Sequence, residues 1–178
     1  MKKTVIVFGL IAGLIVTSLM AFSIAKCYNN QDFEGSMILG YAAMVLAFSF
    51  IFVGIKNHRD KYNDGTITFV KGFKIGLLIT IIASSIYVIV WLVEYYFFIP
   101  DFMDKYVEHM LLETKKSGAN ATEMAKQTQE LAEYKEMYNN PLLVVLFTYM
   151  EILPVGIIIS TISALILKRK QNVSLSPM

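Results

Sequence analysis

Charged residues are segregated along this 178-residue chain far more strongly than a soluble fold requires. Four stretches, together 88 residues, contain a single charge, Glu151, and the other 90 residues contain the remaining 29. The stretches are Thr4–Ala25, Ser36–Ile55, Ile75–Val93 and Pro141–Leu167. Overall, 17% of the residues are charged, against about 25% in a typical soluble domain. The pattern excludes an ordinary globular domain, a disordered chain and a collagen-like fibre, and it indicates an integral membrane protein.

Each stretch is long enough to cross a membrane, because about 20 apolar residues at 1.5 Å rise span a hydrocarbon core of roughly 30 Å. Each must be helical, since only a helix satisfies its own backbone in lipid, and no alternation typical of a barrel strand occurs. We predict an all-α polytopic protein forming one membrane domain over residues 1–178. Its four transmembrane helices are expected at about 4–25, 36–55, 75–99 and 141–167, with the third continuing past Pro100. Residues 171–178 are predicted to be a flexible tail.

The first span has an alternative interpretation as a cleaved signal peptide. Lys2 and Lys3, an apolar run and the small residues around Ser23–Ala25 resemble such a peptide. The apolar run of 22 residues is longer than the usual 7–15, so we expect the span to be retained. The single Cys27 cannot form an internal disulfide, and Lys26 before it does not fit a lipoprotein signal.

Basic residues predict the orientation, because cytoplasmic loops carry an excess of Lys and Arg. Ten of the sixteen flank one side of the predicted spans: Lys2, Lys3, Lys56, Arg59, Lys61, Lys71, Lys74, Lys168, Arg169 and Lys170. The other side has six, and its segment Glu94–Asn140 also holds nine acids. We therefore expect both termini in the cytoplasm.

The segment at 101–139 is predicted to be an extracytoplasmic helical hairpin inserted between the third and fourth spans. Phe102, Tyr106 and Met110 recur at four-residue steps, and Met124, Leu131, Tyr134 and Tyr138 also follow a helical period. Ser117–Asn120 interrupts the pattern, and Asn120 followed by Glu123 is typical of a capping box. The hairpin is interpreted as solvated, and a dedicated partner-binding surface is the alternative.

Small residues recur at four-residue steps in three spans, where they favour close helix packing in lipid. The positions expected to pack are Gly9, Gly13, Gly72, Gly76, Gly156 and Ser160. We interpret these stripes as packing within one bundle, and a homodimer seam is the alternative.

Glu151 is the one charge inside a span, about ten residues and hence roughly 15 Å from Pro141. A carboxylate at that depth costs about 2.5 kcal/mol or more, so it should be protonated, paired or facing water. Pro154 has no N–H for the Met150 carbonyl and is expected to kink the helix. Glu151, with Glu94 and Tyr149 nearby, is therefore a candidate ion or proton site; the alternative is a neutral packing residue.

No catalytic residues are recognisable, so we expect no enzyme, no cofactor and no metal site. His58 and His109 are predicted on opposite sides of the membrane, and neither a nucleotide-binding loop nor a nucleophile motif occurs. No basic, aromatic surface indicates nucleic-acid binding. The expected partners are the lipid bilayer and another membrane protein or a second copy of the chain.

Several short motifs resemble an uncharacterised membrane-protein family of Bacteroidetes catalogued as domain of unknown function 4199. They are the early Gly9–Gly13 repeat, the runs Gly54–Lys61 and Gly65–Phe69, and the run Tyr96–Phe102. The resemblance covers nearly the whole chain and implies four spans in a bacterial cytoplasmic membrane. It implies no activity, so no functional residue follows from it.

Two functional hypotheses remain. The leading one is a non-enzymatic assembly or scaffold subunit of a membrane complex, with 101–138 as the partner surface. The alternative is a small oligomeric transporter or channel subunit that uses Glu151 for a cation or proton, with Glu94 as a second candidate residue. A water-filled cavity at Glu151 would favour transport, and a Glu151 sealed against neighbouring side chains would favour scaffolding.

Overall fold

The computed structural model describes residues 1–30 and 33–169, so the predicted tail at 171–178 lies outside the described residues. The described part consists of helices joined by short connections. They are α1 (Lys2–Asn30), α2 (Phe33–Tyr62), α3 (Phe69–Val93), the π-helical turn η1 (Glu94–Phe98), α4 (Phe102–Lys116), α5 (Ala121–Tyr138) and α6 (Pro141–Leu167). The described residues form no β-strand, apart from one isolated bridge between Ile67 and Arg169. The predicted all-α class is confirmed.

Four helices are long and apolar enough to cross a membrane, as predicted. They occupy Lys2–Tyr28, Met37–Tyr62, Phe69–Phe98 and Pro141–Leu167. The first three extend beyond the charge-free stretches, because a helix continues into its polar flanks until a capping or breaking residue ends it. At the start of α3 this residue is Thr68, whose hydroxyl accepts a hydrogen bond from the Lys71 N–H at 3.3 Å.

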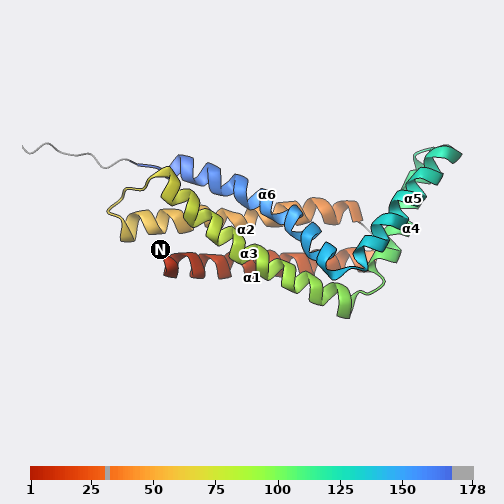
Figure 1. Ribbon diagram of the computed structural model, residues 1–178, viewed down its shortest axis with the longest axis horizontal. Helices are drawn as coiled ribbons and strands as arrows, with labels where there is room; N and C mark the ends of the chain where they lie inside the picture. The colour runs from red at the N-terminus through yellow and green to blue at the C-terminus, as the bar shows by residue number, and fades with distance from the viewer. Residues whose placement is uncertain (31–32, 170–178) are drawn as a thin grey trace, which may run out of the picture.

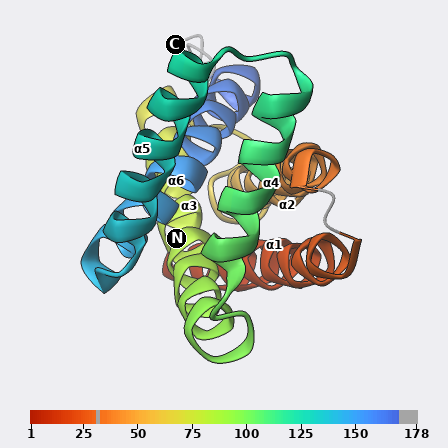
Figure 2. The same cartoon turned by 90° about the vertical axis from the view of Figure 1, so that its right-hand side faces the viewer.

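The four spans form a ring in the order α1, α2, α6, α3 (Figure 2). The most extensive packing joins α3 to α6, followed by α1 to α2 and α1 to α3. The two ends of this bundle differ. We call the end where α1 begins and α6 ends the terminal end, and the opposite end, beside α4 and α5, the α4–α5 end (Figure 1).

The distribution of polar and apolar side chains is that of a protein in lipid. Small polar residues are buried inside the bundle, including Thr17, Thr80 and Ser160. Large apolar residues face outward from every span; examples are Leu14, Ile38, Ile89 and Ile158. A soluble monomer rarely exposes so much contiguous apolar surface, whereas lipid covers it at no cost.

Small residues bring α3 and α6 into close contact in the terminal half of the bundle. A Cβ added at Gly76 would lie 2.8 Å from the Ser160 Cβ, and one at Gly156 would lie 2.2 Å from the Thr80 Cγ2. The hydroxyls of Thr80 and Ser160 are 3.2 Å apart, within hydrogen-bonding distance. Gly9 and Gly13 of α1 instead receive isoleucine side chains of α3. The stripes of α3 and α6 therefore contact each other within one chain, whereas the stripe of α1 packs against larger side chains.

The third span ends before Pro100, and the expectation that it continues past this residue was wrong. Proline disfavours helical geometry in the residue before it, and Ile99 is not helical, with φ −133° and ψ 55°. The last turn of the span widens into η1, where the Ile99 N–H donates to the Glu94 carbonyl at 3.0 Å. Helix α4 then starts afresh at Phe102.

Helices α4 and α5 pack against each other and extend away from the α4–α5 end of the bundle (Figure 1). Asn120 caps α5, and the Glu123 carboxylate accepts the Asn120 N–H at 2.9 Å, which confirms the predicted capping box. Lys135 of α5 forms an ion pair with Asp104 of α4. Asn140 caps α6, with Pro141 in its first turn, so the chain re-enters the bundle without an unsatisfied N–H at the junction.

Candidate functional site

Glu151 lies on α6 and is exposed, whereas Thr148 and Ile152 beside it are buried. Among the described residues, the Glu151 carboxylate has no hydrogen-bond donor and no ion-pair partner. Pro154, one turn later on the same helix, has no N–H to donate to the Met150 carbonyl. Glu151 is therefore an unsatisfied carboxyl group in the middle of an apolar span.

Glu151 lines a cavity of about 250 Å³ in the α4–α5 half of the bundle. All four spans contribute to its wall, with Val16 and Met20 of α1, Ala43 of α2, and Thr148 of α6 among the lining residues. The Thr148 hydroxyl donates to the Val144 carbonyl at 2.7 Å, so its proton is already used within α6. The cavity therefore presents one carboxyl group on a mostly apolar wall.

Six aromatic residues also line this cavity. They are Tyr87 and Trp91 of α3, Phe102 and Tyr106 of α4, and Tyr134 and Tyr138 of α5. The rings contact one another across elements: Trp91 meets Phe102 edge to face at 5.4 Å between centroids. Burial raises the pKa of the Tyr106 and Tyr138 hydroxyls, so both stay protonated at neutral pH.

Helices α4 and α5 lie at one end of the bundle (Figure 2), and both contribute residues to the wall of this cavity. Tyr28, near the end of α1, donates a hydrogen bond of 2.5 Å to the Asp101 carboxylate beside α4. The Lys105 ammonium lies 3.4 Å from the centroid of the Tyr28 ring and 3.2 Å from Asp101. The Tyr28 hydrogen bond, aided by Lys105, holds the pKa of Asp101 below its ordinary value of 3.8. These contacts attach α4 to α1.

Glu94 and Tyr149, the other two residues of the candidate ion site, do not line the cavity with Glu151. Glu94 is half-buried at the start of η1, and its Oε2 atom is buried without a hydrogen-bond partner among the described residues. Tyr149 is half-buried, and its hydroxyl is 2.9 Å from that of Ser85 on α3.

Sequence reasoning missed the aromatic wall contributed by α4 and α5. The helical spacing of Phe102, Tyr106, Tyr134 and Tyr138 was visible, but it was interpreted as the inner face of a solvated hairpin. The same face closes the end of the bundle, because the connection at Ile99–Asp101 turns α4 across it. The chain's one cysteine, Cys27, and His109 also line the cavity. Within the described residues, no group of three or more His, Cys, Asp or Glu side chains is placed to bind a metal ion.

The fold and its apolar exterior define the class: an all-helical membrane protein with four spans. The family model described as "Protein of unknown function (DUF4199)" matches residues 7–169. The chain belongs to this family, as the resemblance had indicated. No curated protein and no solved structure matches the chain.

Proposed function

We propose that this protein is a subunit of a small oligomeric transporter or channel, in which Glu151 takes up a proton or a cation. One observation supports this function above the scaffold hypothesis: Glu151 faces a cavity and has no partner among the described residues. A central carboxylate costs about 2.5–3.5 kcal/mol in a transmembrane helix even on the lower scales. A group that only packed would be sealed by neighbouring donors, whereas an open carboxyl group can exchange its proton or counter-ion.

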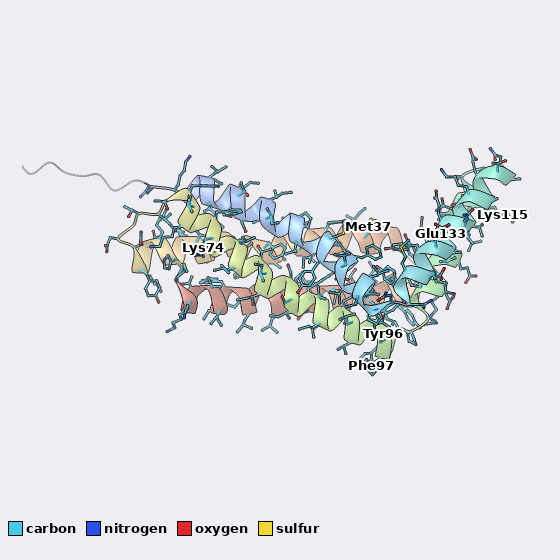
Figure 3. The ribbon with its side chains drawn as sticks, in the orientation of Figure 1. Met37, Lys74, Tyr96, Phe97, Lys115 and Glu133 are labelled. Carbon is cyan, nitrogen blue, oxygen red and sulfur yellow. The ribbon has the colours of Figure 1, made fainter. Side chains whose placement is uncertain are left out.

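The proposed topology places both termini in the cytoplasm of a bacterial inner membrane. Nine of the ten basic residues counted on that side fall within the described residues, in segments at the terminal end; Lys74 is an example (Figure 3). The excess of positive charge at one end matches the positive-inside rule. Helices α4 and α5 are then an extracytoplasmic hairpin, and the cavity lies in the outer half of the membrane.

The proposal requires more than one copy or a second conformation. Below the cavity, Gly76, Gly156, Thr80 and Ser160 bring α3 and α6 into direct contact. This contact leaves no opening between α3 and α6 in the terminal half, so we infer that passage from Glu151 to the terminal end needs a second copy or another conformation. Four helices are also few for a carrier that works alone.

Reconstitution into liposomes tests the proposed function. The purified protein should carry protons or monovalent cations down an imposed gradient, measured with a pH-sensitive dye and with ion-selective dyes. Glu151→Gln should abolish this flux. Glu136→Gln, which removes an exposed acid of α5, should leave it unchanged. Absence of flux in the wild-type protein, or full flux in Glu151→Gln, would contradict the proposal.

A scaffold or assembly role is the second candidate, and the outward extension of α4 and α5 favours it. This pair extends beyond the bundle and carries exposed charges such as Lys115 and Glu133 (Figure 3). Exposed Leu112 lies on the same pair. Co-purification from native membranes tests this role: a stoichiometric partner that is lost when Leu112 is changed to Glu would support it, and recovery of the protein alone would contradict it.

A further inference from the structure

The charge of the cavity limits what it can bind. Among the described residues that line it, Glu151 is the only acid, and neither Lys nor Arg is present. An ionised carboxylate in apolar surroundings needs a counter-charge, because its transfer from water is otherwise very costly. His109 also lines the cavity, and with its imidazole uncharged the cavity is neutral with one proton or with one monovalent cation.

The oxygen content of the wall argues against a metal ion as this cation. Hard metal ions take about six or more oxygen ligands. Here the Thr148 hydroxyl already donates within α6. The remaining polar side chains of the wall are four phenols on three helices, together with Ser23, Cys27, Trp91 and His109. A dehydrated inorganic ion would lose more hydration than this wall replaces.

The aromatic wall instead suits an organic cation. Tyr and Trp rings attract a cation over their faces, most strongly when water is excluded. Trp91 and Tyr87 approach from α3, and Tyr106 and Tyr138 from the covering helices. Methionines, including Met20, Met103 and Met110, supply adaptable apolar contacts around them. A charge with apolar substituents would satisfy both the carboxylate and the rings.

The volume limits the size of the ligand. Pockets for drug-sized ligands measure about 300–1,000 Å³, and this cavity of about 250 Å³ lies just below that range. We propose that the cavity binds one small monovalent organic cation, of the size of a quaternary ammonium group with a single aromatic ring, with Glu151 as its counter-ion. The inference rests on the proposed function in that both assign the uptake of charge to Glu151.

Calorimetric titration of the purified protein in nanodiscs tests the proposal, with benzyltrimethylammonium as the probe. Its uncharged isostere, neopentylbenzene, has a carbon in place of the nitrogen. The wild-type protein should bind the cation, and the isostere should bind at least tenfold more weakly. Glu151→Gln should weaken cation binding at least tenfold, Glu151→Asp should weaken it less, and Glu136→Gln should leave it unchanged. Tyr106→Leu should weaken it severalfold through the loss of one ring.

Three results would overturn the inference: no binding of the cation, equal binding of cation and isostere, or unchanged cation affinity in Glu151→Gln. Equal binding would instead identify a site for uncharged apolar molecules such as lipid chains. The emission of Trp91, the only tryptophan, verifies that each variant is folded. Glu151-dependent flux without cation binding would overturn this inference and leave the proposed function standing. Glu151-dependent binding without flux would support the inference and contradict transport.

Discussion

The two halves of the bundle are packed in different ways. In the terminal half, glycine and serine let α3 and α6 approach so closely that no additional methyl group fits. In the α4–α5 half, residues of all four spans surround a cavity whose wall includes six large aromatic residues. The comparison indicates that packing in the terminal half holds the bundle together, whereas the α4–α5 half contains a cavity suited to a ligand. Substitutions at matched positions in the two halves test this difference in packing.

The largest effect on stability is expected for Gly156→Ala in the terminal half. The new Cβ would lie 2.2 Å from Thr80, whose side chain is fully buried and cannot move aside. We expect a loss of about 3 kcal/mol, the upper end of typical overpacking costs. Thermal unfolding in detergent, followed by far-UV circular dichroism, measures it.

Gly40→Ala is the matched control in the α4–α5 half, which contains the cavity. Gly40 lines the cavity, and a Cβ there meets no atom within 4 Å. Alanine should therefore be neutral or stabilise α2 by about 0.5–1 kcal/mol through its helix propensity. Equal destabilisation by the two substitutions would refute the distinction between the halves.

A smaller contrast is expected between two alanines one turn apart on α2. Ala47 is fully buried in the packed core, and Ala43 lines the cavity. Ala47→Leu should cost about 2 kcal/mol through overpacking, and Ala43→Leu should cost clearly less because its side chain enters the cavity. Ala43→Leu should also reduce binding of benzyltrimethylammonium, which titration calorimetry measures. Equal melting temperatures, or undiminished binding, would contradict the placement of the cavity.

The smallest effect is expected for the contacts of Asp101 that attach α4 to α1 at the α4–α5 end. Because the pKa of Asp101 is held below 3.8, its contribution is complete above pH 3.8 and is lost as pH falls through the lower folded value. Trp91 packs against Phe102 of α4, so its fluorescence should shift over that acidic range. Asp101→Ala should show the acid spectrum at neutral pH. Glu108→Ala, an exposed change on the same helix, should not, and an identical shift in both variants would exclude a specific role for Asp101.

The spans and the capping box could be predicted from the sequence because they depend on local patterns. Charge-free runs determine where a helix can cross lipid, and Asn120 with Glu123 determines where α5 begins. Glu151 could be singled out for the same reason, as the only charge in the four stretches. These properties require no knowledge of which helices are neighbours.

The cavity could not be predicted, because it depends on the order of the helices and on one turn. No pattern in the sequence places α6 between α2 and α3, or turns Phe102 and Tyr106 over the end of the bundle. An apolar helix face indicates that the helix packs against another element, but it does not show which element that is. Glu94 and Tyr149 were grouped with Glu151 by their distance along the chain and by depth, and their positions around the helices separate them from it.

The π-helical turn η1 also has a consequence for chain register. A π turn accommodates one residue more than an α turn, so Glu94–Phe98 is equivalent to a single-residue insertion at the end of α3. Deleting one residue there would restore α geometry and rotate the exit of the chain by about 100° around the helix axis. Helix α4 would then leave in another direction, and Phe102 would no longer meet Trp91. The one extra residue in η1 thus determines whether α4 covers the α4–α5 end of the bundle.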